Sequence, residues 1–191
     1  MEVILVANKK GGVGKTTCAD ELAFALTRAG KRVAFANLDP QGGTVHENES
    51  TAEGVHDYQI VDTPGSMTDK DLARLCRNAD WVLLPTLASM MDLRPLNDSY
   101  NIAKLNVDNP SQVGVIMNCH DPRITVDKDF EAIIKDTLGF NVVAHIPRTV
   151  AIRKAQAQKT SVADIKGDIG AAAAFDQLAN LIMLRERKGV K

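Results

Sequence analysis

Short apolar runs alternate with amphipathic stretches along most of the chain. Apolar runs bounded by polar or glycine-rich segments are typical of buried β-strands. They predict strands at residues 3–7, 32–38, 58–61, 81–84, 113–117 and 141–144. Apolar residues spaced three and four apart predict helices over residues 15–29, 69–78, 93–105 and 127–138. The polar residues 42–54 predict a loop, and the rest of the chain to Arg187 is expected to be helical apart from turns.

This alternation indicates an α/β fold with a mostly parallel, twisted sheet. Parallel strands need crossover connections, and the predicted helices supply them while covering both faces of the sheet. The sequence shows no internal repeat, low-complexity segment or linker. We therefore expect a single domain over residues 1–191.

Composition places the chain among ordinary globular proteins. Of its 191 residues, 45% are hydrophobic and 25% are charged, which excludes a disordered tail. The formal net charge is −1, so binding to nucleic acid would have to come from a local basic patch. Aromatic residues make up only 4%, too few for the base-stacking surface of a single-strand binder.

The cysteines and histidines predict neither a disulfide framework nor a metal centre. Three scattered cysteines form no C-x-x-C pair and are expected to be small buried side chains. The histidines, His46, His56, His120 and His145, share no ligand spacing, so no metal site is predicted among them. The chain begins without a signal-peptide pattern and has no run of about 18 apolar residues, so we expect a cytoplasmic protein.

The first predicted strand leads into a glycine-rich segment with two lysines. Its sequence is Lys10-Gly11-Gly12-Val13-Gly14-Lys15-Thr16-Thr17, and a predicted helix follows. Glycines let backbone N–H groups close around phosphate oxygens, and the helix N-terminus adds its dipole. In such loops the lysine at Lys15 reaches the β- and γ-phosphates, and the Thr16 hydroxyl ligates Mg²⁺. The usual motif has glycine where this chain has Lys9, so the segment predicts a variant ATP and Mg²⁺ site distinguished by Lys10.

Two aspartates follow later strands. Asp39 comes after the second predicted strand, where a carboxylate can face the γ-phosphate, the metal and the attacking water. Asp62 ends the third strand and suits a carboxylate that holds Mg²⁺ through water. Because the carboxyl ends of parallel strands meet at one edge of a sheet, both side chains are expected near the phosphate loop.

Together these motifs resemble the ParA/MinD family of deviant Walker-type ATPases, and they are most similar to its short ParA-type partition and positioning members. The resemblance spans nearly the whole chain, and its other matching segments are Leu38-Asp39-Pro40-Gln41-Gly42, Ile60-Val61-Asp62-Thr63-Pro64-Gly65 and Ile146-Pro147-Arg148. It implies a P-loop NTPase fold and slow, partner-stimulated hydrolysis of ATP. It also implies that Lys10, Lys15 and Asp39 are the catalytic residues.

By this resemblance, Lys10 reaches across an ATP-dependent homodimer to the phosphates bound by the other protomer. Asn118 contacts the adenine, and Pro147 lies in the segment beside the base. The metal is supported by Thr16, Asp39 and Asp62. The expected ATP-binding residues are Lys10, Gly11, Gly12, Val13, Gly14, Lys15, Thr16, Thr17, Asn118 and Pro147. Asn37 departs from the family, because many members have an aspartate there.

A local basic cluster is compatible with a solvated helix surface and, by the resemblance, with a DNA-binding surface. Residues 137–163 contain no acidic residue, and their basic members are Arg148, Arg153, Lys154 and Lys159. In the family this part of the dimer contacts the DNA backbone, so the resemblance implies non-specific binding to double-stranded DNA and a nucleoid-associated ATP form. It further implies a ParB-like centromere-binding or adaptor protein that stimulates hydrolysis. The cargo, whether a plasmid, a chromosome or another assembly, is not encoded here.

The main alternative is a MinD-like ATPase that cycles on a membrane. It would need a terminal amphipathic helix. The candidate stripe is Phe175, Leu178, Ala179 and Ile182, followed by Arg185, Arg187, Lys188 and Lys191. Such a stripe more often closes the flank of a sheet, so membrane binding is not favoured. An electron-transfer ATPase would need paired cluster cysteines, and a metabolic kinase or ligase would need an acceptor-substrate motif; the sequence shows neither.

Overall fold

The computed structural model describes residues 1–46, 55–168 and 170–189, with side chains up to Arg185. Its strands are β1 (Glu2–Val6), β2 (Val33–Asn37), β3 (Tyr58–Asp62), β4 (Trp81–Thr86), β5 (Val113–His120) and β6 (Val142–Pro147). They form one six-stranded sheet in the order β2-β3-β1-β4-β5-β6. Every pairing is parallel, which confirms the predicted α/β fold.

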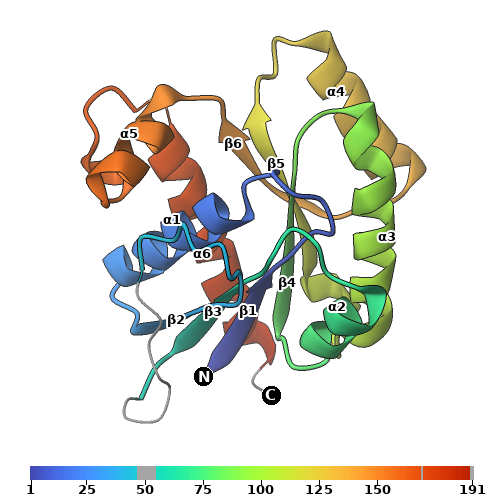
Figure 1. Ribbon diagram of the computed structural model, residues 1–191, viewed down its shortest axis with the longest axis horizontal. Helices are drawn as coiled ribbons and strands as arrows, with labels where there is room; N and C mark the ends of the chain where they lie inside the picture. Colours follow the sequence, from blue (N-terminus) through green and yellow to red (C-terminus); the bar gives the residue numbers. More distant parts are fainter. Residues whose placement is uncertain (47–54, 169, 190–191) are drawn as a thin grey trace.

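Helices cover both faces of this sheet, as Figure 1 shows. One layer consists of α1 (Lys15–Arg28), α5 (Val150–Gln158) and α6 (Ala171–Gly189). The other consists of α2 (Asp69–Cys76), α3 (Met90–Asn106) and α4 (Thr125–Ala132). Three short segments complete the described structure: 3₁₀ turns at Pro110–Gln112 and Val162–Asp164, and a π-helical turn at Ile133–Thr137. The described residues include no helix long and apolar enough to cross a membrane.

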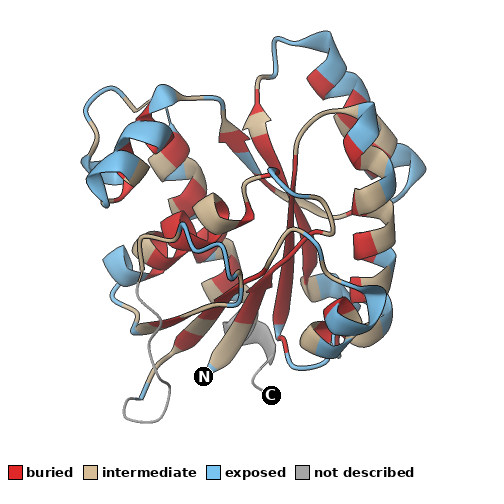
Figure 2. Cartoon of the chain, viewed as in Figure 1, coloured by how far each residue is buried: buried red, intermediate tan, exposed pale blue. Residues whose placement is uncertain are grey.

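Alternate strand residues divide the core into two parts, one on each face of the sheet. Ile4 and Val6 pack toward α1 and α6, whereas Leu5 and Ala7 pack toward α2 and α3. The strands are therefore buried on both sides, and the exposed surface lies on the outer sides of the helices (Figure 2). This is why the strand sequences are continuously apolar and do not alternate.

The apolar stripe of α6 belongs to this core. Its four residues are at most 1% exposed, and they are Phe175, Leu178, Ala179 and Ile182. The stripe closes one face of the sheet, so these residues are not available to a membrane. Arg185 donates to the backbone oxygen of Ser111 at 2.6 Å, while the side chains of Arg187 and Lys188, and Lys191 itself, lie outside the described residues.

The predicted elements are present, and they differ from the prediction mainly at their ends. β4, β5 and β6 each run past the predicted apolar stretch into polar residues or proline at the carboxyl edge, where the site lies. Helix was expected after the last strand apart from turns, whereas the described residues 159–168 contain no α-helix. Lys159 adopts a left-handed conformation (φ 52°) and ends α5, and a 3₁₀ turn at Val162–Asp164 follows among the described residues before α6. The predicted loop over 42–54 lies partly outside the described residues, which omit 47–54.

The strand order creates a crevice beside the central strand β1. From β1 the chain crosses one face through α1 to β2, and from β3 it crosses the other face through α2 to β4. Where successive connections leave on opposite faces, the carboxyl ends of the strands diverge and form a ligand crevice. The glycine-rich loop follows β1 at this point, and Asp39 and Asp62 follow or end the neighbouring strands.

Candidate nucleotide-binding site

The loop between β1 and α1 has a conformation that only glycine adopts easily. Gly12 (φ 75°) and Gly14 (φ 93°) are both left-handed, and Gly14 is the residue that precedes α1. A Cβ atom at Gly14 would overlap Nδ2 of Asn118. Glycine is therefore required here both by the backbone and by the close approach of β5.

Neighbouring elements hold this loop in place. Asn8 donates from Nδ2 to the carbonyl oxygen of Pro85 at 2.9 Å and accepts the N–H of Lys10 at 3.0 Å. On the other side, Nδ2 of Asn118 donates to the carbonyl oxygen of Val13 at 2.9 Å. Side chains from the loop itself and from β5 therefore fix its shape without any ligand.

Lys15 is nearly buried inside the loop that it follows. It is 6% exposed, and its Nζ donates to the carbonyl oxygen of Lys10 at 3.0 Å. Burial lowers the pKa of Lys15, while the nearby carboxylates of Asp62 and Asp39 oppose that shift. A phosphate group in the loop would supply the negative charge that this ammonium group lacks at close range.

Thr16 and Asp62 form the part of the site that suits Mg²⁺. The hydroxyl of Thr16 donates to Oδ2 of Asp62 at 2.7 Å, and the N–H of Thr63 donates to Oδ1 at 3.0 Å. Asp62 is fully buried, and burial raises its pKa to about 6 despite these hydrogen bonds and the charge of Lys15. A hydroxyl and a carboxylate are the hard oxygen donors that Mg²⁺ prefers, and a buried carboxylate is stabilised by a cation, so these residues fit the ion.

Asp39 reaches the same cavity from the loop after β2. Its N–H donates to Oδ1 of Asn37 at 2.8 Å, and its Oδ1 accepts the N–H of Gln41 at 2.9 Å. Asn37 thus shapes the turn that presents Asp39, which gives the asparagine at this position a structural role. The cavity measures about 350 Å³ and is lined by Gly11, Gly12, Gly14, Lys15, Thr16, Thr17, Asp39 and Gly65.

A second cavity of about 530 Å³ shares Thr17 with the first and continues from it. It contains the two residues predicted beside the base, Asn118 and Pro147. The other lining residues were not predicted as base contacts, and they are Cys119, Arg148, Thr149, Val150, Ile152, Arg153 and Gln156. Most of them come from α5 and the turn before it, and the matching segment at 146–148 was the sequence signal that pointed to this region. Both volumes lie in the range of small-molecule sites, and we call the two cavities the phosphate cavity and the base cavity after the predictions for their lining residues.

Lys10 points away from both cavities. Its Nζ forms an ion pair with Oδ1 of Asp92 at 2.5 Å, and Asp92, in the first turn of α3, is only 2% exposed. The neighbouring Lys9 pairs instead with Asp69 at 2.6 Å. Asp92 was missed by the sequence analysis, because nothing local to it indicates that it meets the phosphate loop.

The four basic residues predicted to bind DNA divide between two places. Arg148 and Arg153 line the base cavity, whereas Lys154 and Lys159 lie on or just after α5 and do not line it. All four are exposed, and within the described residues none of them forms an ion pair. They are therefore available to an anionic partner, although the two arginines also border the nucleotide site.

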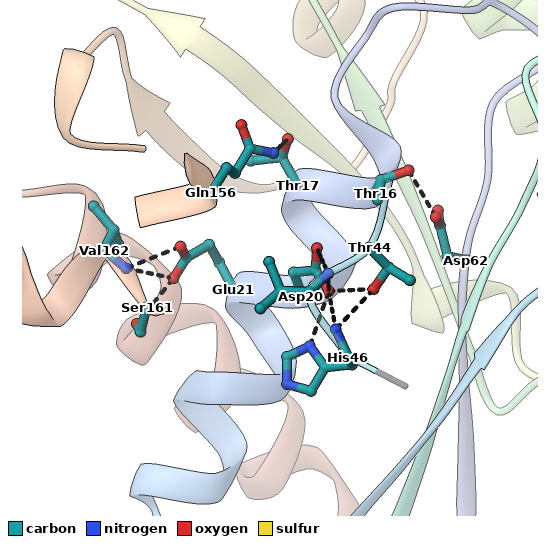
Figure 3. A network of polar contacts seen from close by, with 11 residues as sticks. Thr16, Thr17, Asp20, Glu21, Thr44, His46, Asp62, Gln156, Ser161 and Val162 are labelled. Carbon is teal, nitrogen blue, oxygen red and sulfur yellow. Dashed lines mark hydrogen bonds and ion pairs between the residues drawn. The ribbon is translucent and has the colours of Figure 1, made fainter. Parts of the chain in front are cut away.

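Figure 3 shows that polar side chains of α1 bind segments on both sides of the helix. Asp20 accepts hydrogen bonds from the side chain of Thr44 at 2.5 Å and from Nδ1 of His46 at 2.8 Å. On the opposite side, Glu21 accepts the N–H of Val162 at 2.9 Å. Two further contacts, Thr16 with Asp62 and Thr17 with Gln156, extend the network. The phosphate loop and the segments around it are consequently joined through one helix.

Comparison with known proteins agrees with this geometry. Residues 4–162 match the family described as the CobQ/CobB/MinD/ParA nucleotide binding domain. Over 209 aligned positions, the chain is 27% identical to "Maintenance of carboxysome distribution protein A" of Halothiobacillus neapolitanus, covering 94% of this chain and 95% of that protein. A solved ATP complex of a McdA variant from Cyanothece is similar with a TM-score of 0.79, 18% identity and 96% of each chain covered. MinD of Aquifex aeolicus gives a TM-score of 0.77 at 18% identity, covering 96% of this chain and 97% of that one.

Proposed function

Since the chain belongs to the CobQ/CobB/MinD/ParA family of nucleotide-binding domains, we propose that it is a ParA-type ATPase that works as a molecular switch. ATP joins two protomers into a dimer, the dimer binds double-stranded DNA without sequence preference, and hydrolysis releases it. A ParB-like or adaptor protein stimulates the hydrolysis. The cycle positions a cargo, a role supported by the relative named for carboxysome distribution.

The position of Lys10 is the observation that carries this proposal. Its ammonium group lies outside its own phosphate cavity and is held by Asp92, whereas Lys15 already serves that cavity. Its own phosphate cavity therefore does not use Lys10, and the dimer requires the ammonium group to exchange Asp92 for another anionic partner. In a dimer the new partner is the γ-phosphate bound by the second protomer, in a seam from which water is excluded and charge pairing is strong.

The residues around the phosphate cavity have distinct roles in this mechanism. Lys15 and the loop N–H groups bind the β- and γ-phosphates, and Asp39 orients the attacking water. Thr16 and Asp62 would hold Mg²⁺, which neutralises charge on the phosphate oxygens when it is bound. Asn118 and Pro147 bind the base in the adjoining cavity.

Energetic magnitudes are compatible with such a switch. Moving a monomer–dimer population from 1:99 to 99:1 needs about 5.5 kcal/mol of differential interaction. Each dimer would form two new lysine–phosphate contacts, one per protomer, and charge-assisted contacts in a desolvated seam are the stronger class. ADP lacks the γ-phosphate and so does not supply them.

The first experiment measures the molar mass of the protein by sedimentation equilibrium with Mg²⁺ and either ATP or ADP. We expect a dimer with ATP and a monomer with ADP. The Lys10→Ala variant should bind ATP but remain monomeric, and Lys15→Ala should lose nucleotide binding. Lys9→Ala removes a neighbouring lysine that pairs with Asp69, and it should still dimerise. A monomeric wild-type protein at saturating ATP would overturn the proposal.

The second experiment tests the DNA-binding surface by titrating salt in a binding assay with non-specific duplex. Affinity falls with salt at a slope of about −0.9 per neutralised phosphate on logarithmic axes. Lys154→Ala lies outside the base cavity, so it should leave ATP binding intact while reducing the slope of the dimer by about 1.8. Equal affinity of the ATP and ADP forms would contradict the coupling of DNA binding to dimerisation.

A further inference from the structure

Two histidines and a glutamate meet at the side of the sheet formed by β5, β6 and α4. His120 ends β5, His145 lies on β6, and Glu131 lies on α4. Nε2 of His145 is 2.9 Å from Oε1 of Glu131, and Nε2 of His120 is 3.6 Å from Oε2. The three ligand atoms all lie within 4.8 Å of one another. This cluster contains none of the residues assigned above to the nucleotide.

An irregularity in the sheet brings the two histidines together. Met117 on β5 pairs with His145, but His120 pairs with Pro147, so β5 contains one more residue than β6 between these pairs. Cys119 absorbs the extra residue in a left-handed conformation (φ 53°). Because side chains alternate along a strand, one extra residue turns His120 to the same side as His145. The imidazole rings lie with their centroids 4.7 Å apart.

The environment of His120 leaves a buried nitrogen atom available to a ligand. Its side chain is 8% exposed, and within the described part of the chain its buried Nε2 has no hydrogen-bond partner. Burial and the neighbouring His145 lower the pKa of His120. A buried polar atom without a partner is costly, and it needs an explanation such as an ion.

We propose that His120, Glu131 and His145 form a binding site for a divalent transition-metal ion of the zinc class. Two imidazole nitrogens and one carboxylate oxygen are ligands that Zn²⁺ prefers, and three protein ligands leave the fourth position of a tetrahedral site to water. Ligand atoms of such a site lie about 3.3 Å apart. Nε2 of His145 lies 2.9 Å from Oε1 of Glu131 and Nε2 of His120 lies 3.6 Å from Oε2, so each histidine is close to this distance from one of the two carboxylate oxygens.

The proposed ion would restrict the movement of the strands that carry residues of the base cavity. His120 lies two residues after Asn118, and His145 lies two residues before Pro147. Pro147 lines both the base cavity and a cavity of about 520 Å³ that contains His120, Glu131 and His145. An ion that ties β5, β6 and α4 together would thus hold the two strands that present these residues. Lys135 lies 3.4 Å from Oε1 of Glu131, and it would have to move away when the ion binds.

The test is a Zn²⁺ titration of the EDTA-treated full chain, without nucleotide, against a chromogenic chelator. We expect one Zn²⁺ per chain and at least about a tenfold loss of affinity in both His145→Gln and Glu131→Gln. His145 is 41% exposed on its side chain, so its variant should fold. Zn²⁺ at a hundredfold excess over its dissociation constant should raise the Tm of the wild type by about 5 °C or more, and not that of His145→Gln.

Two controls make the result decisive. His56→Gln removes a histidine outside the cluster and should bind Zn²⁺ as the wild type does. Cys119→Ser removes the adjacent thiol and should also retain Zn²⁺ binding. When Co²⁺ replaces Zn²⁺ in this variant, it should give the visible absorption of a tetrahedral site. The proposal is wrong if no Zn²⁺ binds, if both cluster variants bind it normally, or if only the loss of Cys119 abolishes binding.

Discussion

At the scale of single residues, Gly14 is required for two reasons: its left-handed backbone and the lack of space for a side chain. Its left-handed backbone starts α1, and the space where a side chain would begin is occupied by the amide of Asn118. The same amide group donates to Val13 and faces the base cavity. One position therefore controls both the shape of the phosphate loop and the placement of Asn118, which lines the base cavity.

Gly14→Ala should lower the free energy of unfolding by about 2–4 kcal/mol and abolish ATP binding, because the new methyl group displaces Asn118 in addition to straining the backbone. The matched control is Gly139→Ala. Gly139 is also left-handed (φ 67°), but a Cβ atom there meets nothing within 4 Å. The control should cost only about 1 kcal/mol. Equal losses in chemical denaturation would show that the contact with Asn118 has no energetic importance.

Burial of the Asp62 carboxylate lowers the stability of the ligand-free protein. Its pKa is raised from an ordinary value near 3.8 to about 6, so the folded state binds the proton more tightly than the unfolded state does. The carboxylate therefore destabilises the ligand-free protein as pH rises from about 4 to 6, and this cost is fully present at pH 7. Below about pH 4 both states are protonated and the cost disappears.

Asp62→Asn should consequently raise the free energy of unfolding of the ligand-free protein at pH 7, by about 1–3 kcal/mol, and by much less at pH 4. An asparagine can still accept the N–H of Thr63 and donate to the hydroxyl of Thr16. Urea unfolding at the two pH values measures the difference. The same variant should lose Mg²⁺-dependent binding of ATP, and a variant less stable at pH 7 than at pH 4 relative to the wild type would contradict the assignment.

At the scale of elements, α1 connects the nucleotide site to segments on two sides. Asp20 and Glu21 are adjacent and both are 2% exposed, yet they hold different parts of the chain. Asp20 binds residues 44–46, beyond the loop of Asp39, and Glu21 binds residues 161–162, after α5. A helix that presents consecutive side chains about 100° apart can hold two segments at once.

Replacing Asp20 or Glu21 should loosen the segment that the replaced residue binds and leave the other segment unchanged. Asp20→Ala should increase amide hydrogen exchange at residues 44–46, and Glu21→Ala should increase it at residues 161–162, each by about tenfold or more. Each variant is the control for the other, since both remove one buried carboxylate from the same turn. Mass spectrometry of the corresponding peptides measures the exchange. Equal loosening of both segments in either variant would show that α1 responds as a whole.

At the scale of the whole molecule, the ion pair between Lys10 and Asp92 opposes the proposed dimer. The lysine has to leave a buried carboxylate of its own chain before it can bind the other protomer. The intrachain pair thus sets a threshold for dimerisation, because two states compete for one charge.

Asp92→Asn should lower the ATP concentration at which half of the protein is dimeric, by about three- to tenfold, since Lys10 is released in advance. Asp69→Asn is a matched control: Asp69 also lies in the first turn of a helix and pairs with a lysine, but with Lys9. It should leave the midpoint unchanged. Sedimentation measured across an ATP titration distinguishes the variants, and a midpoint that Asp92→Asn fails to lower would contradict the competition.

Local sequence predicted a large part of this protein. Apolar runs located the strands, because burial on both faces requires continuous hydrophobic residues, and the glycine-rich segment located Lys15 and Thr16. The expectation for Asn118 and Pro147 came from the family resemblance, and both residues line the base cavity. The partner of Lys10 was not predictable, since Asp92 meets it only after α3 packs against β4 and β5.

The histidine cluster could not be predicted from local sequence. Their spacing along the chain predicted no metal site, and the pairing of β5 with β6 nevertheless places His120 beside His145. The decisive feature is a one-residue shift at Cys119, which no pattern of apolar residues records. After such a shift, the face of the sheet on which a side chain lies depends on strand register. Register is set by the pairing of two strands and cannot be read from one strand alone.

What the sequence by itself determined is the order of the elements, the parallel α/β sheet and the chemistry of the phosphate loop. These follow from burial, backbone freedom and charge within short segments of chain. Only the tertiary structure decided which carboxylate holds Lys10, which arginines line the base cavity and which side chains lie around Glu131. Such contacts form only when segments that are distant in the sequence pack together, so they cannot be read from the residues of either segment alone.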